Sequence, residues 1–231
     1  MKTIGMIGGM SWESSAEYYR IINETVKKQL GGLHSAKCML YSLEFEEIEQ
    51  LQHAGDWAAL EDILVDAAEK LKGSGADFIV ICTNTMHKLA PAIEKRAGVK
   101  LLHIAAVAGE KIVQQKLKKV ALLGTKFTME QDFYKRVLSD AYQMDVMIPN
   151  PEEREMIHGV IYQELCQGQI KAESREKIKA VIRRLAAAGA EAIVLGCTEL
   201  PLLIKSSDSE LPVFDTTELH ATAAAAYALE K

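Results

Sequence analysis

The sequence predicts an α/β protein made of two pseudosymmetric domains, each a mainly parallel sheet flanked by helices. Short apolar segments alternate with longer amphipathic ones along the 231 residues, as in parallel sheets wrapped by helices. Two segments also echo each other, one starting at Gly75 and the other at Gly189. Both read Gly-Ala-acid, then an apolar run, then polar residues around Cys and Thr. The echo indicates two halves that face each other across one site.

Composition is typical of a globular protein and argues against several classes of partner. The chain is 48% apolar and 26% charged, which are ordinary values. Its net charge of −5 and lack of a basic block argue against nucleic acid. No apolar run approaches the ~20 residues that span a bilayer, and the N-terminus lacks a signal-peptide core. The four cysteines have neither metal-ligand spacing nor a dense disulfide pattern, so we expect a reduced, cytoplasmic protein with no metal site.

The first domain is predicted to span residues 1–108 and to regain residues 210–231 from the end of the chain. A capping box of Ser14 and Glu17 starts a helix that ends near residues 31–32. Apolar residues spaced for one helix face predict a second long helix over residues 56–72. The apolar segments read as strands at 3–8, 37–43, 77–81 and 100–104, with further helices at 45–53, 88–96, 106–117 and 217–229.

The pattern restarts at residue 119, which predicts a second domain over residues 109–209. Its strands are expected at 119–123, 145–148 and 192–195, with a last short strand at 211–214. Its helices are expected at 129–141, 152–166 and 172–187.

Polar residues gather where four of these strands end, at 8–11, 83–85, 124–128 and 197–199. In open parallel sheets, ligands bind outside the carboxyl ends of the strands. The glycines at 8–9 allow backbone N–H groups to approach an anion at a helix N-terminus, although the full dinucleotide-binding fingerprint is absent. The sequence therefore places a ligand site at the strand ends.

Five segments, in this order, resemble the aspartate/glutamate racemase superfamily: residues 4–10, 75–79, 84–87, 122–125 and 196–199. The resemblance implies two pseudosymmetric domains with the active site in the interdomain cleft, a small-molecule amino-acid substrate, no cofactor such as pyridoxal phosphate, and a homodimer. It also implies one thiol from each domain on opposite sides of the substrate Cα. One thiolate removes the α-proton and the opposite thiol returns one. Dense hydrogen bonding to the α-carboxylate must stabilise the carbanion.

The chain departs from the family pattern at its first thiol. The family has Cys-Asn-Thr, whereas here Thr83 precedes Asn84 and Cys82 lies one place earlier. Aligned on the internal repeat, Thr83 matches Cys197. A shift of one residue in an extended segment turns a side chain to the opposite face. We expect either an asymmetric Thr83/Cys197 pair in which Cys197 removes the proton of L-substrates, or a local bulge that returns Cys82 to the site.

Further residues match the superfamily by position. Glu199 follows Cys197 where aspartate racemases carry glutamate, and it either assists proton transfer or caps the next helix. His87 either assists the first-domain side or is a structural hydrogen-bonding residue. The positions that the resemblance assigns to substrate binding are Met10 and Ser11, through their backbone, with Asn84, Thr85, Thr125 and Thr198; each of the polar ones could instead cap a helix.

The side-chain specificity is less well defined. Aspartate-specific relatives use an arginine after the second strand, where this chain has acidic residues and Gln52. They also use a lysine on a later helix, where this chain has Cys166. Either Lys126 or Arg154 serves as the cation, or the site takes neutral amino acids. We expect a racemase of L-aspartate and L-glutamate. The alternatives are a broad-specificity racemase using Cys82 and Cys197, a single-thiol decarboxylase or isomerase of the same superfamily, and a non-catalytic amino-acid-binding sensor.

Overall fold

The computed structural model describes residues 1–230, and the chain divides into two compact units. Unit 1 contains residues 1–104 together with the residues from 217 onward. Unit 2 is the continuous segment Ala105–Thr216 between them. Each unit is an α/β layer structure built on one four-stranded parallel sheet, which confirms the predicted fold class.

The sheet of unit 1 has the strand order β2-β1-β3-β4. Ile4 at the start of β1 is level with Cys38 of β2 on one side and with Phe78 of β3 on the other. This register brings the carboxyl ends of the central strands to one edge of the sheet. The strands are β1 (Ile4–Gly8), β2 (Cys38–Ser42), β3 (Phe78–Ile81) and β4 (Lys100–Leu101).

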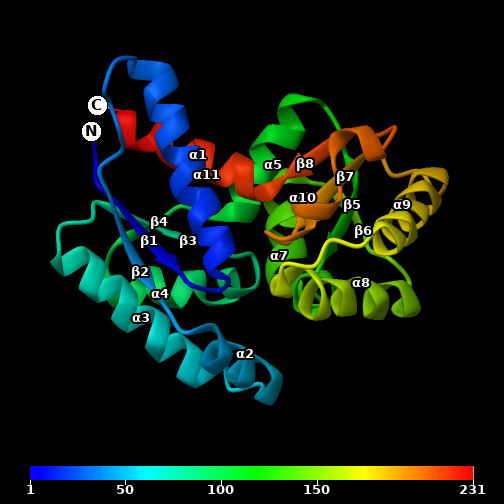
Figure 1. Cartoon of the computed structure of the whole chain (residues 1–231), viewed down its shortest axis with the longest axis horizontal. Helices are drawn as coiled ribbons and strands as arrows, with labels where there is room; N and C mark the ends of the chain where they lie inside the picture. The colour runs from blue at the N-terminus through cyan, green and yellow to red at the C-terminus, as the bar shows by residue number, and fades with distance from the viewer. Residues whose placement is uncertain (231) are drawn as a thin grey trace. The chain divides into compact units, whose positions relative to one another are not determined.

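Helices cover both faces of this sheet, so its central strands are apolar throughout. One face carries α1 (Trp12–Leu30) and α11 (Thr216–Leu229), and the other carries α3 (Trp57–Gly73) and α4 (Ala90–Ala97) (Figure 1). Side chains of β3 alternate between the faces, because successive residues of a strand point in opposite directions. Phe78 and Val80 contact the α1/α11 layer, whereas Ile79 and Ile81 belong to the α3/α4 layer. Unit 1 is completed by α2 (Phe45–Ala54) and the 3₁₀ helix η1 (Thr85–Leu89).

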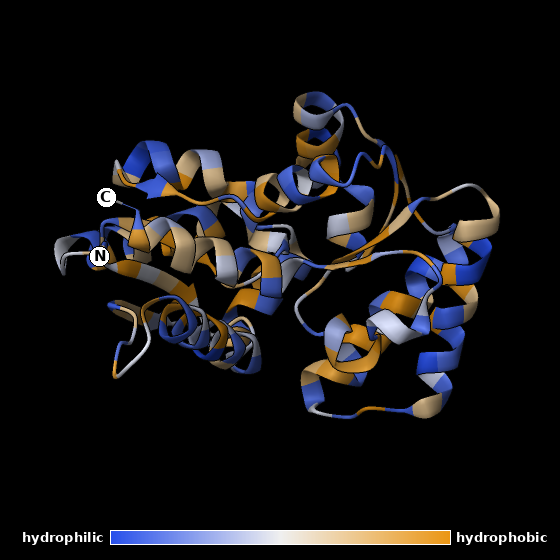
Figure 2. Ribbon diagram, turned by 90° about the horizontal axis from the view of Figure 1, so that it is seen from above, coloured by the Kyte–Doolittle hydropathy of each residue, from blue (hydrophilic) through white to orange (hydrophobic). Residues whose placement is uncertain are grey.

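The sheet of unit 2 repeats the topology, with the order β6-β5-β7-β8. Its main core lies between the sheet and the pair α8 and α9, where Ala121 and Leu123 of β5 meet Ile193 and Leu195 of β7. In Figure 2 the strands are mainly orange, whereas the helices carry both colours, as amphipathic helices over a buried sheet should. The elements are α5 (Ile104–Gln114), β5 (Lys119–Gly124), α6 (Lys126–Glu130), α7 (Asp132–Arg136), η2 (Val137–Ala141), β6 (Asp145–Met147), α8 (Pro151–Gln163), η3 (Leu165–Gln167), α9 (Ala172–Ala187), β7 (Ala192–Gly196), α10 (Leu200–Leu203), η4 (Ser206–Asp208) and β8 (Val213–Asp215).

The division between the units differs from the predicted boundaries at residues 108 and 210. β8 pairs in parallel with β7, Val213 beside Ile193, so the segment up to Thr216 belongs to unit 2 and the return to unit 1 begins at Thr217. From Ala105 onward, α5 is also part of unit 2. The predicted single helix over residues 129–141 is likewise broken at Gln131, whose backbone is extended.

Within residues 1–230, no helix is both long and apolar enough to cross a membrane.

Candidate active site

Cys197 follows directly on β7, where the ends of β5 and β7 approach closely. A Cβ atom on Gly196 would lie 2.8 Å from Leu122 Cδ1 and 3.2 Å from the Leu123 carbonyl oxygen. A Cβ on Gly124 would lie 2.7 Å from the Gly196 carbonyl oxygen. Both glycines are therefore needed for the close packing of the two backbones, and Cys197 is the first residue beyond it that carries a side chain.

The Cys197 thiol is hydrogen-bonded to a carboxylate two residues away. Its Sγ donates to Glu199 Oε2 over 3.1 Å, and the Thr198 hydroxyl donates to the same oxygen over 2.8 Å. All three residues are at least nine-tenths buried. Glu199 stands at the N-cap of α10 but its side chain makes no capping hydrogen bond there. The geometry therefore favours the proton-transfer interpretation of Glu199 over the capping one.

The surroundings hold Cys197 in its thiol form. Burial raises the pKa of Cys197 well above its ordinary value, and the nearby Glu199 carboxylate raises it further. Cys166 of η3, which packs against the core cluster that contains Cys197, adds to the same effect on the pKa of Cys197. Cys197 therefore holds its proton on sulfur, beside the Glu199 carboxylate to which it is hydrogen-bonded.

Thr125 lies at the end of the neighbouring strand β5, 6% exposed. Its side chain caps α6 by accepting from the Thr128 N–H over 3.3 Å, and the two threonine hydroxyls are 3.2 Å apart. Of the two predicted roles of Thr125, substrate binding and helix capping, the structure therefore shows the capping role. The second hydroxyl belongs to the fully buried Thr128, which lies in the predicted polar strand end at 124–128 but has no predicted role of its own.

Cys82 of unit 1 is placed quite differently from Cys197. Its backbone N–H continues the sheet by donating to the Ile7 carbonyl over 2.9 Å. Its side chain is fully buried on the α1/α11 face with Phe78 and Val80. This apolar burial raises the pKa of the Cys82 thiol. Thr83, in contrast, is partly exposed.

Asn84 and Thr85 follow Thr83 and are both buried, at 2% and 4% exposure. The turn that holds them is closed by two bonds from His87. The His87 backbone N–H donates to the Asn84 carbonyl over 3.1 Å, and the His87 side chain binds the Thr83 carbonyl through Nδ1 over 2.8 Å. The residues of the first predicted motif are thus held together by a histidine at the next turn.

The glycine corner after β1 is held by serines. Gly9 has a φ of +86°, and a Cβ there would lie 2.1 Å from the Leu43 carbonyl oxygen, so only glycine fits. Its N–H donates to Ser15 Oγ over 2.8 Å, and the Ser15 hydroxyl donates to the Ser11 carbonyl over 3.0 Å. Ser11 caps α1 and Met10 is buried, with a cis peptide bond between them. Ser15 thus ties the glycine corner to α1, and Ser11 serves as the cap of that helix.

The cations considered for a substrate side chain already have acidic partners within unit 2. Lys126 Nζ lies 2.6 Å from Glu155, and Arg154 Nε lies 2.8 Å from Glu130. In unit 1, the buried Gln52 donates to Met86 Sδ over 3.0 Å.

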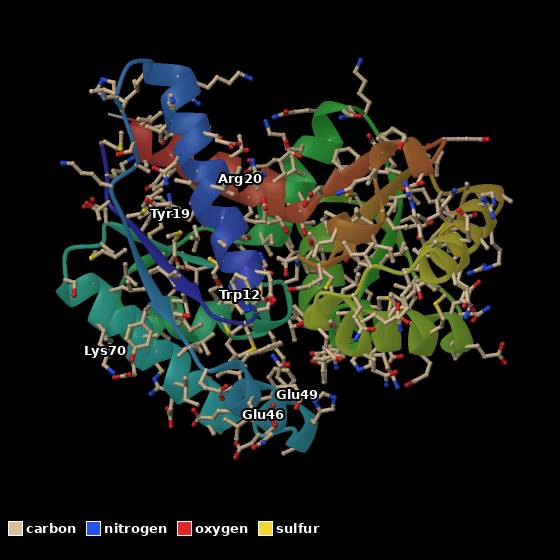
Figure 3. The ribbon with its side chains drawn as sticks, viewed as in Figure 1. Trp12, Tyr19, Arg20, Glu46, Glu49 and Lys70 are labelled. Carbon is tan, nitrogen blue, oxygen red and sulfur yellow. The ribbon has the colours of Figure 1, made fainter. Side chains whose placement is uncertain are left out.

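The segment around Gln52 is acidic. Glu46 and Glu49 lie on the same helix as Gln52, α2 (Figure 3), and Glu44 caps that helix. These residues supply no positive charge that could pair with a substrate carboxylate.

The structure thus brings Cys197, Thr198 and Glu199 into one hydrogen-bonded group in unit 2. In unit 1 it groups Thr83, Asn84 and Thr85 around His87. Sequence reasoning missed His220, which lies beside His87 but is far from it along the chain. Among residues 1–230, no group of three or more His, Cys, Asp or Glu side chains is arranged to hold a metal ion.

Comparison with known proteins gives matches over nearly the whole chain. The family model described as Asp/Glu/Hydantoin racemase matches residues 7–224. A Yersinia pestis protein provisionally assigned as an Asp/Glu racemase superposes with a TM-score of 0.94 and 52% identity over 100% of both chains. An aspartate racemase homologue from Pyrococcus horikoshii OT3 gives 0.86 and 34%, again over 100% of both chains. The broad-specificity amino-acid racemase RacX of Bacillus subtilis (strain 168) is 24% identical over 226 residues, 93% of this chain and 92% of RacX.

Proposed function

Because the chain belongs to the Asp/Glu/Hydantoin racemase family, we propose that it is an amino-acid racemase that removes and returns the Cα proton, with Cys197 as the base for L-substrates. The observation that carries this proposal is the hydrogen bond from the Cys197 thiol to Glu199, 3.1 Å long, at the end of a central strand. A buried thiol paired with a carboxylate is a proton-transfer unit, since the proton can move from sulfur to oxygen without reaching solvent.

The proposed reaction consists of proton transfers only. Glu199 Oε2 takes the proton of Cys197 Sγ, and the thiolate then takes the Cα proton of the substrate. The Cα–H electron pair stays on the substrate and spreads into its carboxylate, which polar groups must stabilise. A proton delivered to the opposite face of Cα completes the inversion. The ammonium group of a bound amino acid would favour the thiolate, which burial and the Glu199 charge disfavour.

Thr83 is the residue of unit 1 that the repeat matches to Cys197, and we assign to it the second proton transfer. In support, Cys82 is fully buried in the apolar layer of α1 and α11, with the alternation of Phe78 and Val80 unbroken. A threonine hydroxyl is too weak an acid to be a resident base, but it can relay a proton. We therefore expect Cα–H exchange with solvent to be faster for L-substrates than for D-substrates, whereas kcat/KM for racemisation is equal in the two directions because the enantiomers are equally stable.

Deuterium exchange at Cα, measured separately for each enantiomer in D₂O, tests both parts of this proposal. We expect exchange of the L-enantiomer to be faster than that of the D-enantiomer. Equal initial rates would refute the assignment of Thr83 while leaving the racemase intact. Tight amino-acid binding without any exchange would instead support a sensor, and release of carbon dioxide would support a decarboxylase.

We infer acidic amino acids as the first substrate candidates, consistent with the aspartate racemase homologue at 34% identity. A broad-specificity racemase is the second candidate. It is favoured by the ion pairs that occupy Lys126 and Arg154 and by the acidic residues on α2.

Exchange measured over a panel of acidic, amide, hydroxyl and aliphatic amino acids separates the two candidates. A kcat/KM for aspartate or glutamate well above that for asparagine or glutamine supports the acidic substrate class. A preference for the neutral amino acids overturns it.

A further inference from the structure

A cluster of three histidines, the buried His87 and His220 and the partly buried His103, lies beside the Thr83 turn in unit 1. His87 and His220 are 1% and 0% exposed, and the rings of His87 and His103 are 4.8 Å apart between centroids. The His87 and His220 rings are 5.5 Å apart. Neither His220 nor His103 lies in a segment with a proposed role in the reaction. Burying polar rings costs desolvation free energy, so their hydrogen bonds must offset that cost.

Each histidine ring is tied to backbone of the same region. His220, on α11, contacts the Leu102 carbonyl through Nε2 over 2.8 Å and the Tyr18 hydroxyl through Nδ1 over 2.7 Å. A carbonyl can only accept, so Nε2 of His220 carries the proton, and the Tyr18 hydroxyl donates to Nδ1. His103 hydrogen-bonds the backbone of His87. The cluster thus joins α1, the end of β4, α11 and η1.

The same reasoning fixes the form of His87. Its Nδ1 lies 2.8 Å from the Thr83 carbonyl oxygen, so Nδ1 carries the proton and donates it. Nε2 is buried, and within residues 1–230 it has no hydrogen-bond partner. The ring is therefore oriented by its bond to the Thr83 carbonyl, by the nearby Leu102 backbone, and by its packing against His103 and His220.

We propose that His87 is a positioning residue for the proposed racemase site: its Nδ1–H fixes the Thr83 carbonyl, and His103 and His220 hold the ring in place for this task. The Thr83 carbonyl belongs to the peptide that joins Thr83 to Asn84, so its direction sets where both side chains leave the strand. This inference rests on the proposed function for its consequence in catalysis. It also makes α11, through His220, a support of the turn that carries Thr83 and Asn84.

Two substitutions of similar size distinguish positioning from simple packing. His87→Asn keeps an N–H donor close to the place of Nδ1, whereas His87→Gln moves its amide toward the place of Nε2. We expect His87→Gln to lower kcat/KM for Cα exchange by about 100-fold, the effect of a displacement of about 1 Å in a catalytic group. We expect His87→Asn to retain most of the wild-type rate. The same pair at the exposed His34 is the control, with no change expected in either variant.

A second measurement does not depend on activity. Amide hydrogen exchange over residues 82–89 should be as slow in His87→Asn as in the wild type and faster in His87→Gln. The ¹⁵N spectrum of wild-type His87 should show protonation at Nδ1 only. Equal kcat/KM and equal amide exchange in the two variants, at equal thermal stability, would overturn the inference. If the wild type exchanges no amino acid at all, the proposed function fails, and the amide exchange and tautomer still decide the role of His87.

Discussion

The ends of β3 and β7 occupy equivalent places in two sheets of the same topology, yet they present different chemistry. After β7, a thiol at Cys197 is hydrogen-bonded to Glu199. After β3, the thiol of Cys82 is buried in the apolar layer of α1 and α11, and Thr83 stands in the position equivalent to Cys197. The orders β2-β1-β3-β4 and β6-β5-β7-β8 show how completely the scaffold is repeated. A symmetric backbone therefore does not impose a symmetric site.

The difference arises from a shift of one position along the strand, which moves the side chain to the opposite face of the sheet. Cys197 continues the face of Ile193 and Leu195, as Thr83 would continue that of Ile79 and Ile81, whereas Cys82 falls on the other face. At the place equivalent to Cys82, unit 2 has Gly196, where a Cβ would lie 3.2 Å from the Leu123 carbonyl oxygen. The close contact of β5 and β7 thus disfavours any side chain, a thiol included, at that position in unit 2.

Removing each thiol in turn is the strongest test of this contrast. Cys197→Ser should lower the Cα exchange rate by about 10²–10⁴-fold, the usual contribution of a proton-transfer group. Cys82→Ala should leave the rate nearly unchanged, since that thiol lies within the apolar core of unit 1. Both rates are measured by deuterium incorporation, with thermal unfolding as a check on folding. A loss in Cys82→Ala comparable to that in Cys197→Ser, in a stable variant, would show that Cys82 reaches the substrate.

Glu199→Gln tests the polar partner that only the second strand end possesses. We expect an exchange rate lowered by roughly 10²-fold, because the amide cannot accept the thiol proton. Alkylation of Cys197 by iodoacetamide should nevertheless become faster at neutral pH. The negative charge of Glu199 raises the pKa of Cys197, and its removal favours the thiolate.

The half-buried Cys38 serves as the internal reference for alkylation. Its rate should not change in Glu199→Gln. Slower alkylation of Cys197 in this variant would mean that Glu199 activates the thiol in the resting protein, contrary to the structure.

The histidine cluster should make unit 1 sensitive to acid. Burial lowers the pKa of His103 to about 4 and of His220 to about 3, and it also lowers that of His87. His103 and His220 further depress His87, while Glu94 partly offsets the effect at His103. The unfolded chain binds protons at these sites near pH 6.5, so stability is full above that pH and falls as the pH drops toward the folded values.

Each histidine should reduce the unfolding free energy by about 1.4 kcal/mol per pH unit over this interval. Chemical denaturation between pH 7 and pH 5 measures the slope. His220→Gln should reduce the slope by the contribution of one proton. An unchanged slope in this variant would show that His220 is protonated in the folded protein.

Much of the fold could be predicted from the sequence because its elements are marked locally. Apolar runs gave the positions of the strands to within a few residues, and the helix-face spacing over residues 56–72 matches α3. The polar strand ends and the parity of Thr83 and Cys197 also followed from spacing along the chain. These features are local, and a periodic pattern records them directly.

Features that depend on contacts between distant segments could not be read in this way. Val213 of β8 pairs with Ile193 of β7, so the chain returns to unit 1 later than the predicted boundary at residue 210. His87 and His220 become neighbours only because α11 packs on the sheet of unit 1. The ion pair of Lys126 with Glu155, which engages a cation considered for the substrate, also requires the fold.

The path of the chain has a consequence for how the protein forms during synthesis. The α1/α11 layer of unit 1 includes Ala221, Ala224, Ala225 and Ala228 of α11. The ribosome makes these residues only after the whole of Ala105–Thr216. Unit 2 is therefore the first unit whose residues are all present, although unit 1 is begun earlier. Until α11 has been synthesised, the face of the first sheet that carries Cys82 stays partly exposed to solvent. Exposed apolar surface of this kind makes a nascent chain prone to aggregation and a substrate for chaperones.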